Sequence, residues 1–137
     1  MSENWVKDIE EMQDKFGTLD WVLDNKKNTE KLKTFLRFRL DFLQEELDET
    51  KTAYETMDGE ELVDGLIDLC VVAIGTLDAF GIDAHKAWDE VLKANMSKRV
   101  GVKEGRPNPL GLPDLMKPEG WKAPSHAGNH GIFNDIR

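Results

Sequence analysis

The 137-residue sequence contains a single cysteine, Cys70, which lies in an apolar run. One cysteine cannot form a disulfide within the chain, so a disulfide-stapled secreted fold is excluded. At this length the chain is expected to form one domain with a hydrophobic core of ordinary size. We expect a reducing compartment, the cytoplasm.

Positive charge is also scarce. Lys and Arg number 18 against 27 Asp and Glu, and the formal net charge is −9. This balance argues against a nucleic-acid backbone as the main partner. It does not exclude a substrate that carries phosphate, because a bound metal ion would reverse the sign of the local charge.

Long apolar runs are missing as well. The longest covers residues 66–77, contains Asp68, and is far shorter than the roughly 20 residues that span a membrane. Residues 1–4 are polar and acidic and do not resemble a signal peptide. The sequence shows no internal repeat, no P-loop and no nucleophile motif. We therefore expect no membrane partner.

Apolar spacing predicts four helices separated by short breaks. Over residues 5–16, apolar residues recur every three or four positions, which places them on one helix face. A break at Gly17 and an apolar connector over residues 19–23 lead to a second helix, which Asn28 or Thr29 can cap. The four predicted helices cover residues 3–16, 29–57, 60–80 and 83–100.

Residues 101–137 differ from the rest of the chain in composition. All five prolines and six of the eleven glycines lie there, and no apolar period is visible. We therefore predict a helical domain over residues 1–100 and an extended tail over residues 101–137. Large apolar residues in the tail, among them Leu112, Leu115 and Trp121, indicate that it lies across a surface of its own chain or of a neighbour.

Two acidic clusters occupy the two long predicted helices. Positions three, four and seven apart share a helix face, so Glu46 and Glu49 point the same way. The same holds for Glu61, Asp64 and Asp68. The short break between the helices allows a hairpin, in which carboxylates that face one another would repel. A hard divalent cation removes that repulsion, and Mg²⁺, with Mn²⁺ as a substitute, suits oxygen ligands.

Plainer explanations exist for both clusters. A solvated charged face accounts for many ExxE patterns, but the face of the first cluster also carries Phe38 and Phe42, which favours an inward position. The second cluster interrupts a helix that is apolar nearly all round, and Asp is rarely buried without a partner. A salt bridge to Arg37 or Arg39, or a hydrated helix end, would also explain it.

The end of the last predicted helix carries amide and cationic side chains. Asn95 and Lys98 continue its inward apolar face, and Lys93 and Arg99 lie close by in sequence. Such a group suits an anionic ligand. The ordinary enrichment of Lys and Arg in a last helical turn is the alternative.

Three segments occur in the order, and on the helices, expected of the motifs of a known family. They are RLDFLQEELDE at 39–49, ELVDGLIDL at 61–69 and NMSK at 95–98. The chain resembles the all-α nucleotide pyrophosphohydrolases, the MazG-type group that also includes dimeric dUTPases and phosphoribosyl-ATP pyrophosphohydrolase. Residues 8–17 also look like the first helix of phage and bacterial members, so the expected cytoplasm would be that of a bacterial host if a phage encodes the chain. The resemblance covers roughly residues 5–100 and implies an all-α fold, a four-helix MazG-like bundle core followed by an extended Pro/Gly-rich C-terminal tail.

The motif of this family is ExxE, a spacer, and then ExxD. Glu46 and Glu49 fit its first half. Glu61 and Asp64 fit the second half literally, although the spacer after Glu49 is short. In the alternative register Asp68 takes the place of the Asp, and a glycine stands where the Glu would be. Both registers stay open at this point, because all three acids share one helix face.

The resemblance implies hydrolysis of a nucleoside triphosphate between its α and β phosphates, which yields the monophosphate and pyrophosphate. Mg²⁺ would be held by Glu46, Glu49, Asp64 and either Asp68 or Glu61. A metal-bound or carboxylate-held water would attack phosphorus, and Glu45, beside the metal pair, is the expected general base. A homodimer or homotetramer is implied as well, in agreement with an apolar third helix that a hairpin leaves uncovered on one flank.

The same resemblance implies substrate-binding roles for other residues. Lys98, together with Lys93 or Arg99, would hold the phosphates. Asn95 would hydrogen-bond the sugar or a phosphate. An aromatic side chain would stack on the base, with three candidates: Phe16, Trp21 and Phe35.

Two alternatives stay open. The same fold could act on dUTP or dCTP, on a modified nucleotide or on an alarmone, because the sequence does not expose the side chains that read the base. The chain could also be a metal-binding helical interaction module without turnover.

Overall fold

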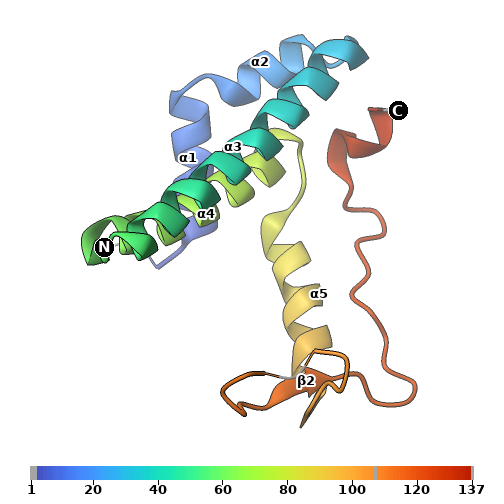
Figure 1. The fold of residues 1–137 in the computed structure, drawn as a ribbon. Coiled ribbons are helices and arrows are strands. Elements are labelled where there is room, and N and C mark those ends of the chain that lie inside the picture. Colours follow the sequence, from blue (N-terminus) through green and yellow to red (C-terminus); the bar gives the residue numbers. More distant parts are fainter. Residues whose placement is uncertain (1–2, 107, 137) are drawn as a thin grey trace. The chain divides into compact units, whose positions relative to one another are not determined.

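The computed structural model describes residues 3–106 and 108–136 (Figure 1). The chain divides into two compact units. The first unit contains the described residues up to Ala84 together with those from His130 onward. The second unit is His85–Asn129.

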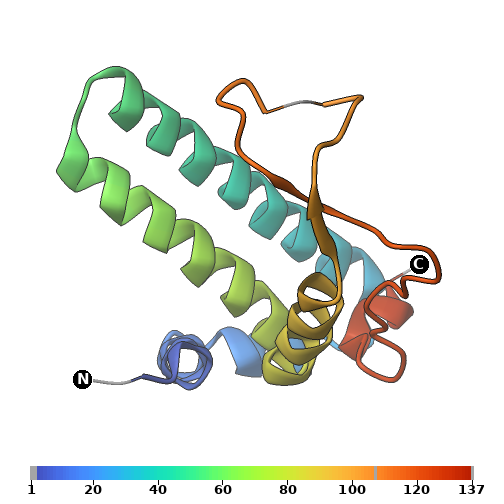
Figure 2. The same ribbon diagram turned by 90° about the horizontal axis from the view of Figure 1, so that it is seen from below.

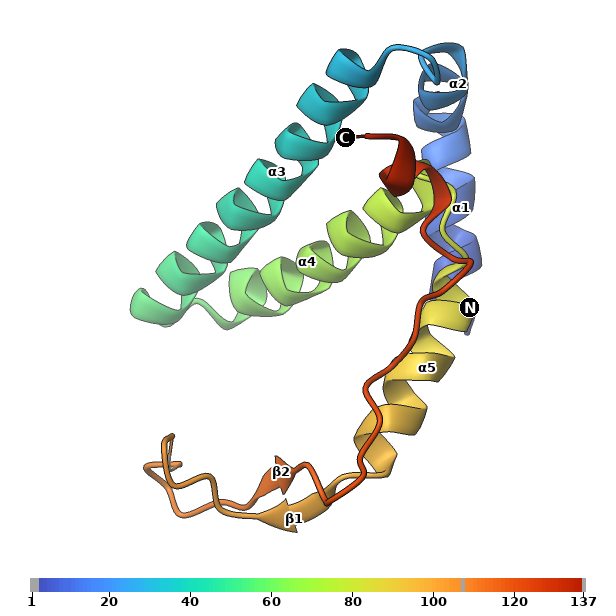
Figure 3. The ribbon, with the colours of Figure 1, turned by 90° about the vertical axis from the view of Figure 1, so that its right-hand side faces the viewer.

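Four α-helices form most of the first unit. They are α1 (Trp5–Lys15), α2 (Thr18–Asp24), α3 (Thr29–Glu55) and α4 (Gly59–Ala79). Figures 2 and 3 show α3 and α4 as the two long arms of a hairpin, joined by a short turn at residues 56–58. Met57 in this turn has a left-handed backbone with φ 57°, and the Asp58 N–H donates a 2.9 Å hydrogen bond to the Ala53 carbonyl oxygen. The predicted hairpin is therefore present.

Side-chain caps begin three of these helices. The side-chain oxygens of Asn4, Asn28 and Asp58 each accept a 3.1 Å hydrogen bond from the backbone N–H three residues later. Each cap satisfies an N–H group that has no partner within its own helix. Of the two predicted caps for α3, Asn28 is the one used.

The prediction of an apolar connector over residues 19–23 was wrong, because this segment is the helix α2. Gly17, with φ 76°, provides the left-handed turn between α1 and α2. Val22 is buried, while Trp21 and Leu23 keep exposed surface. Seven residues are too few for a helical period to show in the sequence. The all-α fold class is confirmed, and the described residues contain one α-helix more than predicted.

The core of the first unit lies where α2, α3 and the end of α4 meet. Phe80 and Leu32 are the largest fully buried side chains, and Val22, Ala79 and Ile82 complete the cluster. The chain returns to this core at its C-terminal end, where the 3₁₀-helix η1 (Gly131–Asp135) packs its apolar residues against it. The Ile132 N–H donates a 2.9 Å hydrogen bond to the Phe80 carbonyl oxygen, and the Phe133 and Phe80 ring centroids are 5.0 Å apart.

Helix α4 is apolar nearly all round but is not buried all round. Val72, Gly75, Thr76 and Ala79 are buried on its inner side. Another flank is exposed and carries Val63, Leu66, Ile67 and Cys70. The hairpin therefore leaves apolar surface uncovered on this helix, as its sequence predicted.

The second unit consists of helix α5 (Ala84–Met96) and a small antiparallel sheet of β1 (Arg99–Gly101) and β2 (Asp114–Met116). Its register pairs Arg99 with Met116, Val100 with Leu115 and Gly101 with Asp114. The Leu115 N–H, which donates to the Asp114 carboxylate, lowers the pKa of Asp114, and Lys103 and Arg106 lower it further by their charge. Arg106 approaches this carboxylate to 3.1 Å.

Residues 118–125 run back along α5. The Trp121 indole N–H donates a 2.9 Å hydrogen bond to the Ala94 carbonyl oxygen, and the Ser125 N–H donates a 3.3 Å bond to the Glu90 carboxylate. The last predicted helix ends at Met96. The tail was predicted to lie across a surface of its own chain or of a neighbour, and its residues 118–125 pack against α5 of the same chain.

Within the described residues, no single helix is both long enough and apolar enough to cross a membrane, whereas α4 and α5 counted together meet these two criteria.

Candidate functional site

A close contact between α3 and α4 brings the two acidic clusters together. A Cβ atom added to Gly65 would overlap the hydroxyl oxygen of Thr50, so only glycine allows α4 to approach α3 this closely. Thr50 is buried, and its hydroxyl donates a 2.7 Å hydrogen bond to the Glu46 carbonyl oxygen one turn earlier. Asp64 and Asp68 lie beside Gly65 on α4. The contact therefore holds carboxylates of both helices near one another.

The charges that shift the pKa of Glu46 are all negative. Partial burial raises the pKa of Glu46, and the charges that raise it further are those of Glu49, Asp68, Glu45 and Asp64. Two of these four carboxylates belong to α3 and two to α4. The two clusters that lie far apart in the sequence are thus one electrostatic group, as predicted from the helix faces.

Asp68 has a similar environment. Partial burial raises the pKa of Asp68, and the charge of Asp64 and a hydrogen bond with Asp64 raise it further. The ion pairs found in the described part of the chain lie elsewhere, between Lys33 and Glu30 and around Asp114. The repulsion within the acidic group is therefore not relieved by a neighbouring Lys or Arg.

Arg39, one of the two arginines considered as salt-bridge partners for the acids of α4, forms its hydrogen bonds with other residues. Its Nε and Nη2 groups each donate a 3.0 Å hydrogen bond, to the Thr76 hydroxyl and to the Val72 carbonyl oxygen. The guanidinium lies 5.9 Å from the centre of the Phe42 ring, and burial lowers the pKa of Arg39. A salt bridge from Arg39 to Asp64 or Asp68 is therefore not the explanation of the second cluster.

The carboxylates do not converge on a single point. Within residues 3–106 and 108–136, no three His, Cys, Asp or Glu side chains are arranged closely enough to hold a metal ion. Glu46 and Asp68 are half-buried, whereas Glu45, Glu49 and Asp64 are exposed. The charges of the exposed members still raise the pKa of Glu46.

Glu61 takes a different position from the other candidate ligands. It lies in the first turn of α4, is exposed, and its backbone N–H donates to the capping Asp58 carboxylate. An acidic residue there also interacts favourably with the positive end of the helix. Its charge is not among those that raise the pKa of Glu46 or of Asp68. The electrostatic group therefore contains Asp68 rather than Glu61.

The predicted phosphate-binding residues belong to the second unit. Lys93 is exposed on α5, and the Lys98 ammonium lies 5.2 Å from the centre of the Trp121 ring. The Asn95 carbonyl oxygen accepts a 3.1 Å hydrogen bond from the Lys98 N–H, and Arg99 begins β1. The structure thus groups these four residues at the end of α5, in a unit separate from that of the carboxylates.

The three aromatic candidates for base stacking differ in their surroundings. Phe16 is exposed at the end of α1. Trp21 is partly exposed on α2, with its ring centroid 5.0 Å from that of Phe35. Phe35 in turn stacks on the buried Phe80 at 5.7 Å. Phe35 is therefore part of the core, while Phe16 and Trp21 retain surface that a ligand could contact.

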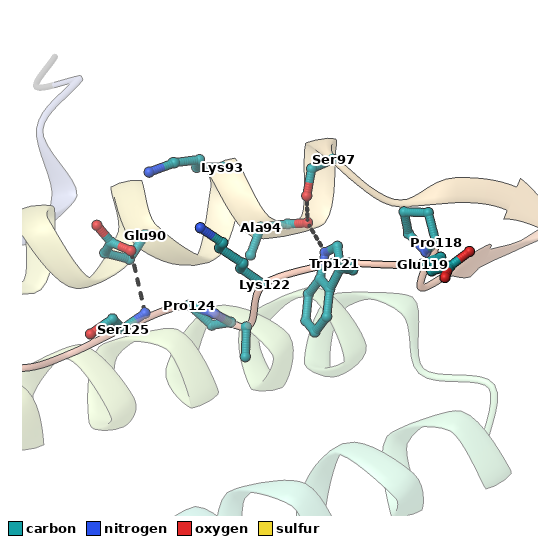
Figure 4. Close-up of a pocket in the computed structure, with 12 residues that line it drawn as sticks. Glu90, Lys93, Ala94, Ser97, Pro118, Glu119, Trp121, Lys122, Pro124 and Ser125 are labelled. Carbon is teal, nitrogen blue, oxygen red and sulfur yellow. Dashed lines mark hydrogen bonds between the residues drawn. The ribbon is translucent and has the colours of Figure 1, made fainter.

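Sequence reasoning missed a pocket in the second unit. It has a volume of about 590 Å³ and lies between α5 and residues 118–125 (Figure 4). Its wall includes Lys93 and Ser97 on one side and Trp121 and Lys122 on the other. A tryptophan flanked by lysines in a proline-rich segment was the available signal, but its proximity to α5 could not be read from spacing.

The family comparison agrees with the acidic group and the fold. The model of the family described as phosphoribosyl-ATP pyrophosphohydrolase matches residues 19–95, more than half of the chain. The matched region contains α2, α3, α4 and nearly all of α5, with both acidic clusters. A search of curated proteins found no match. The chain belongs to the phosphoribosyl-ATP pyrophosphohydrolase family, within the MazG-like group of all-α nucleoside triphosphate pyrophosphohydrolases.

Proposed function

We propose that this protein is a Mg²⁺-dependent nucleoside triphosphate pyrophosphohydrolase that cleaves between the α and β phosphates and releases a nucleoside or deoxynucleoside monophosphate and pyrophosphate. The observation that carries the proposal is the environment of Glu46, where every charge that shifts its pKa is a carboxylate and none is a cation. The family is one of pyrophosphohydrolases, so the chemistry is the hydrolysis of an anhydride.

The donor set fits a hard divalent cation. Four carboxylates, those of Glu46, Glu49, Asp64 and Asp68, supply only oxygen donors, which is the preference of Mg²⁺. A cation there would remove the repulsion that raises the pKa of Glu46 and of Asp68. Glu49 and Asp64 are exposed, and Asp64 is hydrogen-bonded to the half-buried Asp68. When bound, the metal would neutralise phosphate oxygens and polarise phosphorus.

Glu45 is the proposed general base. It precedes Glu46 on α3 and therefore lies about 100° around the helix from it. Its carboxylate is exposed and contributes to the negative charge around Glu46. It would accept a proton from the water that attacks phosphorus. Glu61, by contrast, is the less favoured metal ligand, because it belongs to the first turn of α4.

The cationic residues of the second unit would bind the phosphates. Lys98, with Lys93 or Arg99, supplies positive charge, and Asn95 can donate a hydrogen bond to a sugar or phosphate oxygen. Phe16 and Trp21 retain the exposed aromatic surface needed to stack on a base. A homodimer or homotetramer would cover the apolar flank of α4, which carries Val63, Leu66 and Ile67.

A panel of substrates tests this function. The eight common ribo- and deoxynucleoside triphosphates, with dUTP, an alarmone and phosphoribosyl-ATP as further members, are incubated with Mg²⁺ and with excess EDTA. We expect monophosphate and pyrophosphate from at least one nucleoside triphosphate with Mg²⁺, and no product in EDTA. Hydrolysis in EDTA would refute the metal requirement.

Phosphoribosyl-ATP is included because the family model carries that name. If it alone is hydrolysed, the protein is specific for that substrate. If no member of the panel yields pyrophosphate, the alternative of a metal-binding helical interaction module is favoured.

A further inference from the structure

The pocket of the second unit is formed partly by residues that the family model does not cover. Lys93 and Ala94 on α5 lie inside the matched region, which ends at residue 95. The opposite wall, residues 118–125, lies outside it. The family match therefore covers only one wall of the pocket. Its volume of about 590 Å³ is in the range of pockets that hold small molecules.

The aromatic wall of the pocket is held in place. The Trp121 indole N–H donates to the Ala94 carbonyl oxygen at 2.9 Å, and the Ser97 hydroxyl donates to the same oxygen at 2.7 Å (Figure 4). Pro118 and Pro124, both half-buried, restrict the backbone on either side. A half-buried indole fixed in this way offers a planar apolar surface with little conformational freedom left to lose on binding.

Cations surround this aromatic wall. The ammonium groups of Lys98 and Lys117 lie over the Trp121 ring, 5.2 and 5.1 Å from its centre. A base that packs on the ring would displace one of these long side chains from it. Figure 4 shows Lys93 on α5 and Lys122 reaching toward α5 from the facing segment. The Glu90 carboxylate, also in the wall, accepts the Ser125 N–H and so helps to hold the segment closed.

The net charge of the second unit also favours an anionic ligand. Residues 85–129 contain eight Lys and Arg against five Asp and Glu, a net charge of +3. The rest of the chain contains ten Lys and Arg against twenty-two Asp and Glu, a net charge of −12. Positive charge is thus concentrated in the one unit that contains the pocket, and it would attract an anionic ligand.

We propose that this pocket binds a nucleoside phosphate, whose planar base packs against the Trp121 wall and whose phosphates interact with Lys122 and Lys93. This assignment of Lys93 leaves Arg99 as the partner of Lys98 in the proposed hydrolysis. The ligand class rests on the proposed function, since a pyrophosphohydrolase for nucleotides encounters both a nucleotide substrate and a nucleotide product. The wall also contains the carboxylates of Glu90 and Glu119. The phosphates are assigned to the two ammonium groups, so the site needs no metal ion.

Binding of nucleotides to the full-length protein in excess EDTA tests the proposal, because hydrolysis is not required for the measurement. Isothermal titration calorimetry is performed with ATP, GTP, CTP and UTP, and with tripolyphosphate, which has the charge but no base. We expect saturable binding of at least one nucleotide and weaker binding of tripolyphosphate. Lys122→Gln and Trp121→Leu should each weaken nucleotide binding by about fivefold to tenfold, the value of one charge-assisted or stacking contact.

Lys103→Gln is the matched control, since it removes one positive charge from the same unit outside the pocket and leaves the contact of Arg106 with Asp114 in place. We expect it to bind nucleotide within about twofold of the wild-type protein, because exposed charges at a distance are screened. If Trp121→Leu unfolds the second unit, the nucleotide affinity of Lys122→Gln alone tests the proposal.

Absence of saturable nucleotide binding, equal affinity for tripolyphosphate, or equal losses in Lys122→Gln and Lys103→Gln would each overturn the proposal. None of these results would affect the proposed hydrolysis, which is measured by pyrophosphate release with Mg²⁺.

Discussion

Gly65 of α4 packs directly against Thr50 of α3, and no Cβ atom fits between them. Thr50 is in turn hydrogen-bonded to the carbonyl oxygen of Glu46. This contact lies at the centre of the acidic group, because Glu46 precedes Thr50 by one turn and Asp64 and Asp68 lie beside Gly65. A single missing side chain thus determines how closely the two rows of carboxylates approach.

Gly65→Ala should therefore separate the two helices. We expect a loss of roughly 1–3 kcal/mol in the free energy of unfolding, as for overpacking at other tight contacts, together with a loss of pyrophosphate release. Gly59→Ala is the control, because nothing lies within 4 Å of a Cβ atom at that position of α4. It should leave the stability unchanged or raise it by up to about 1 kcal/mol. Equal urea denaturation midpoints for the two variants would show that the Gly65 contact is not tight.

Glu46→Gln should stabilise the metal-free protein at neutral pH. The pKa of Glu46 and that of Asp68 are raised in the folded state, so the folded protein binds their protons more tightly than the unfolded chain does. The stability that results is fully present below the unfolded pKa, near pH 4, and is lost as the pH rises through the folded pKa. In EDTA, the wild-type protein should become less stable above about pH 4, and Glu46→Gln should show a smaller decrease.

Urea denaturation between about pH 4 and 7 in EDTA measures this difference. Glu11→Gln, an exposed change on α1, serves as the control and should follow the wild-type curve. A Glu46→Gln protein that is less stable than the wild type at pH 7 would show that Glu46 has a stabilising partner.

Glu45→Gln and Glu49→Gln should affect catalysis in different ways. As the proposed base, Glu45 acts mainly in the transition state, so its loss should lower kcat by about a hundredfold or more with little change in the Mg²⁺ requirement. Glu49→Gln removes a proposed ligand and should raise the Mg²⁺ concentration that gives half-maximal activity. Titration of kcat with Mg²⁺ separates the two effects, and the opposite pattern would exchange the two roles.

Phe133→Ala should destabilise the first unit, although Phe133 lies near the end of the sequence. Its ring packs 5.0 Å from that of the buried Phe80, and Ile132 hydrogen-bonds to the same residue. We expect a loss of roughly 2 kcal/mol, less than for a fully buried phenylalanine because Phe133 keeps some exposure. Leu110→Ala, at an exposed position of the second unit, should change the free energy of unfolding by less than about 0.5 kcal/mol. Equal thermal stability of the two variants would show that the C-terminal end contributes nothing to the core.

Much of the helical part of the molecule could be predicted because its signals are local. The side chain of Asn28 caps α3. The backbone of Asp58 closes the turn after α3, and its side chain caps α4. Each of these hydrogen bonds spans three to five residues. The shared helix faces of Glu46 with Glu49 and of Asp64 with Asp68 follow from the 3.6-residue period. The sequence by itself thus determined the hairpin, the family and the acidic composition of the candidate site.

Only the tertiary structure decided which distant residues meet. The overlap that a side chain at Gly65 would make with Thr50, the pocket between Trp121 and α5, and the return of Phe133 to Phe80 each join residues more than ten positions apart. No periodicity encodes such contacts, because they depend on how whole helices pack and not on how one residue follows another along a helix. The same reason explains why Phe35, which the sequence offered as a base-stacking residue, is a core residue beside Phe80.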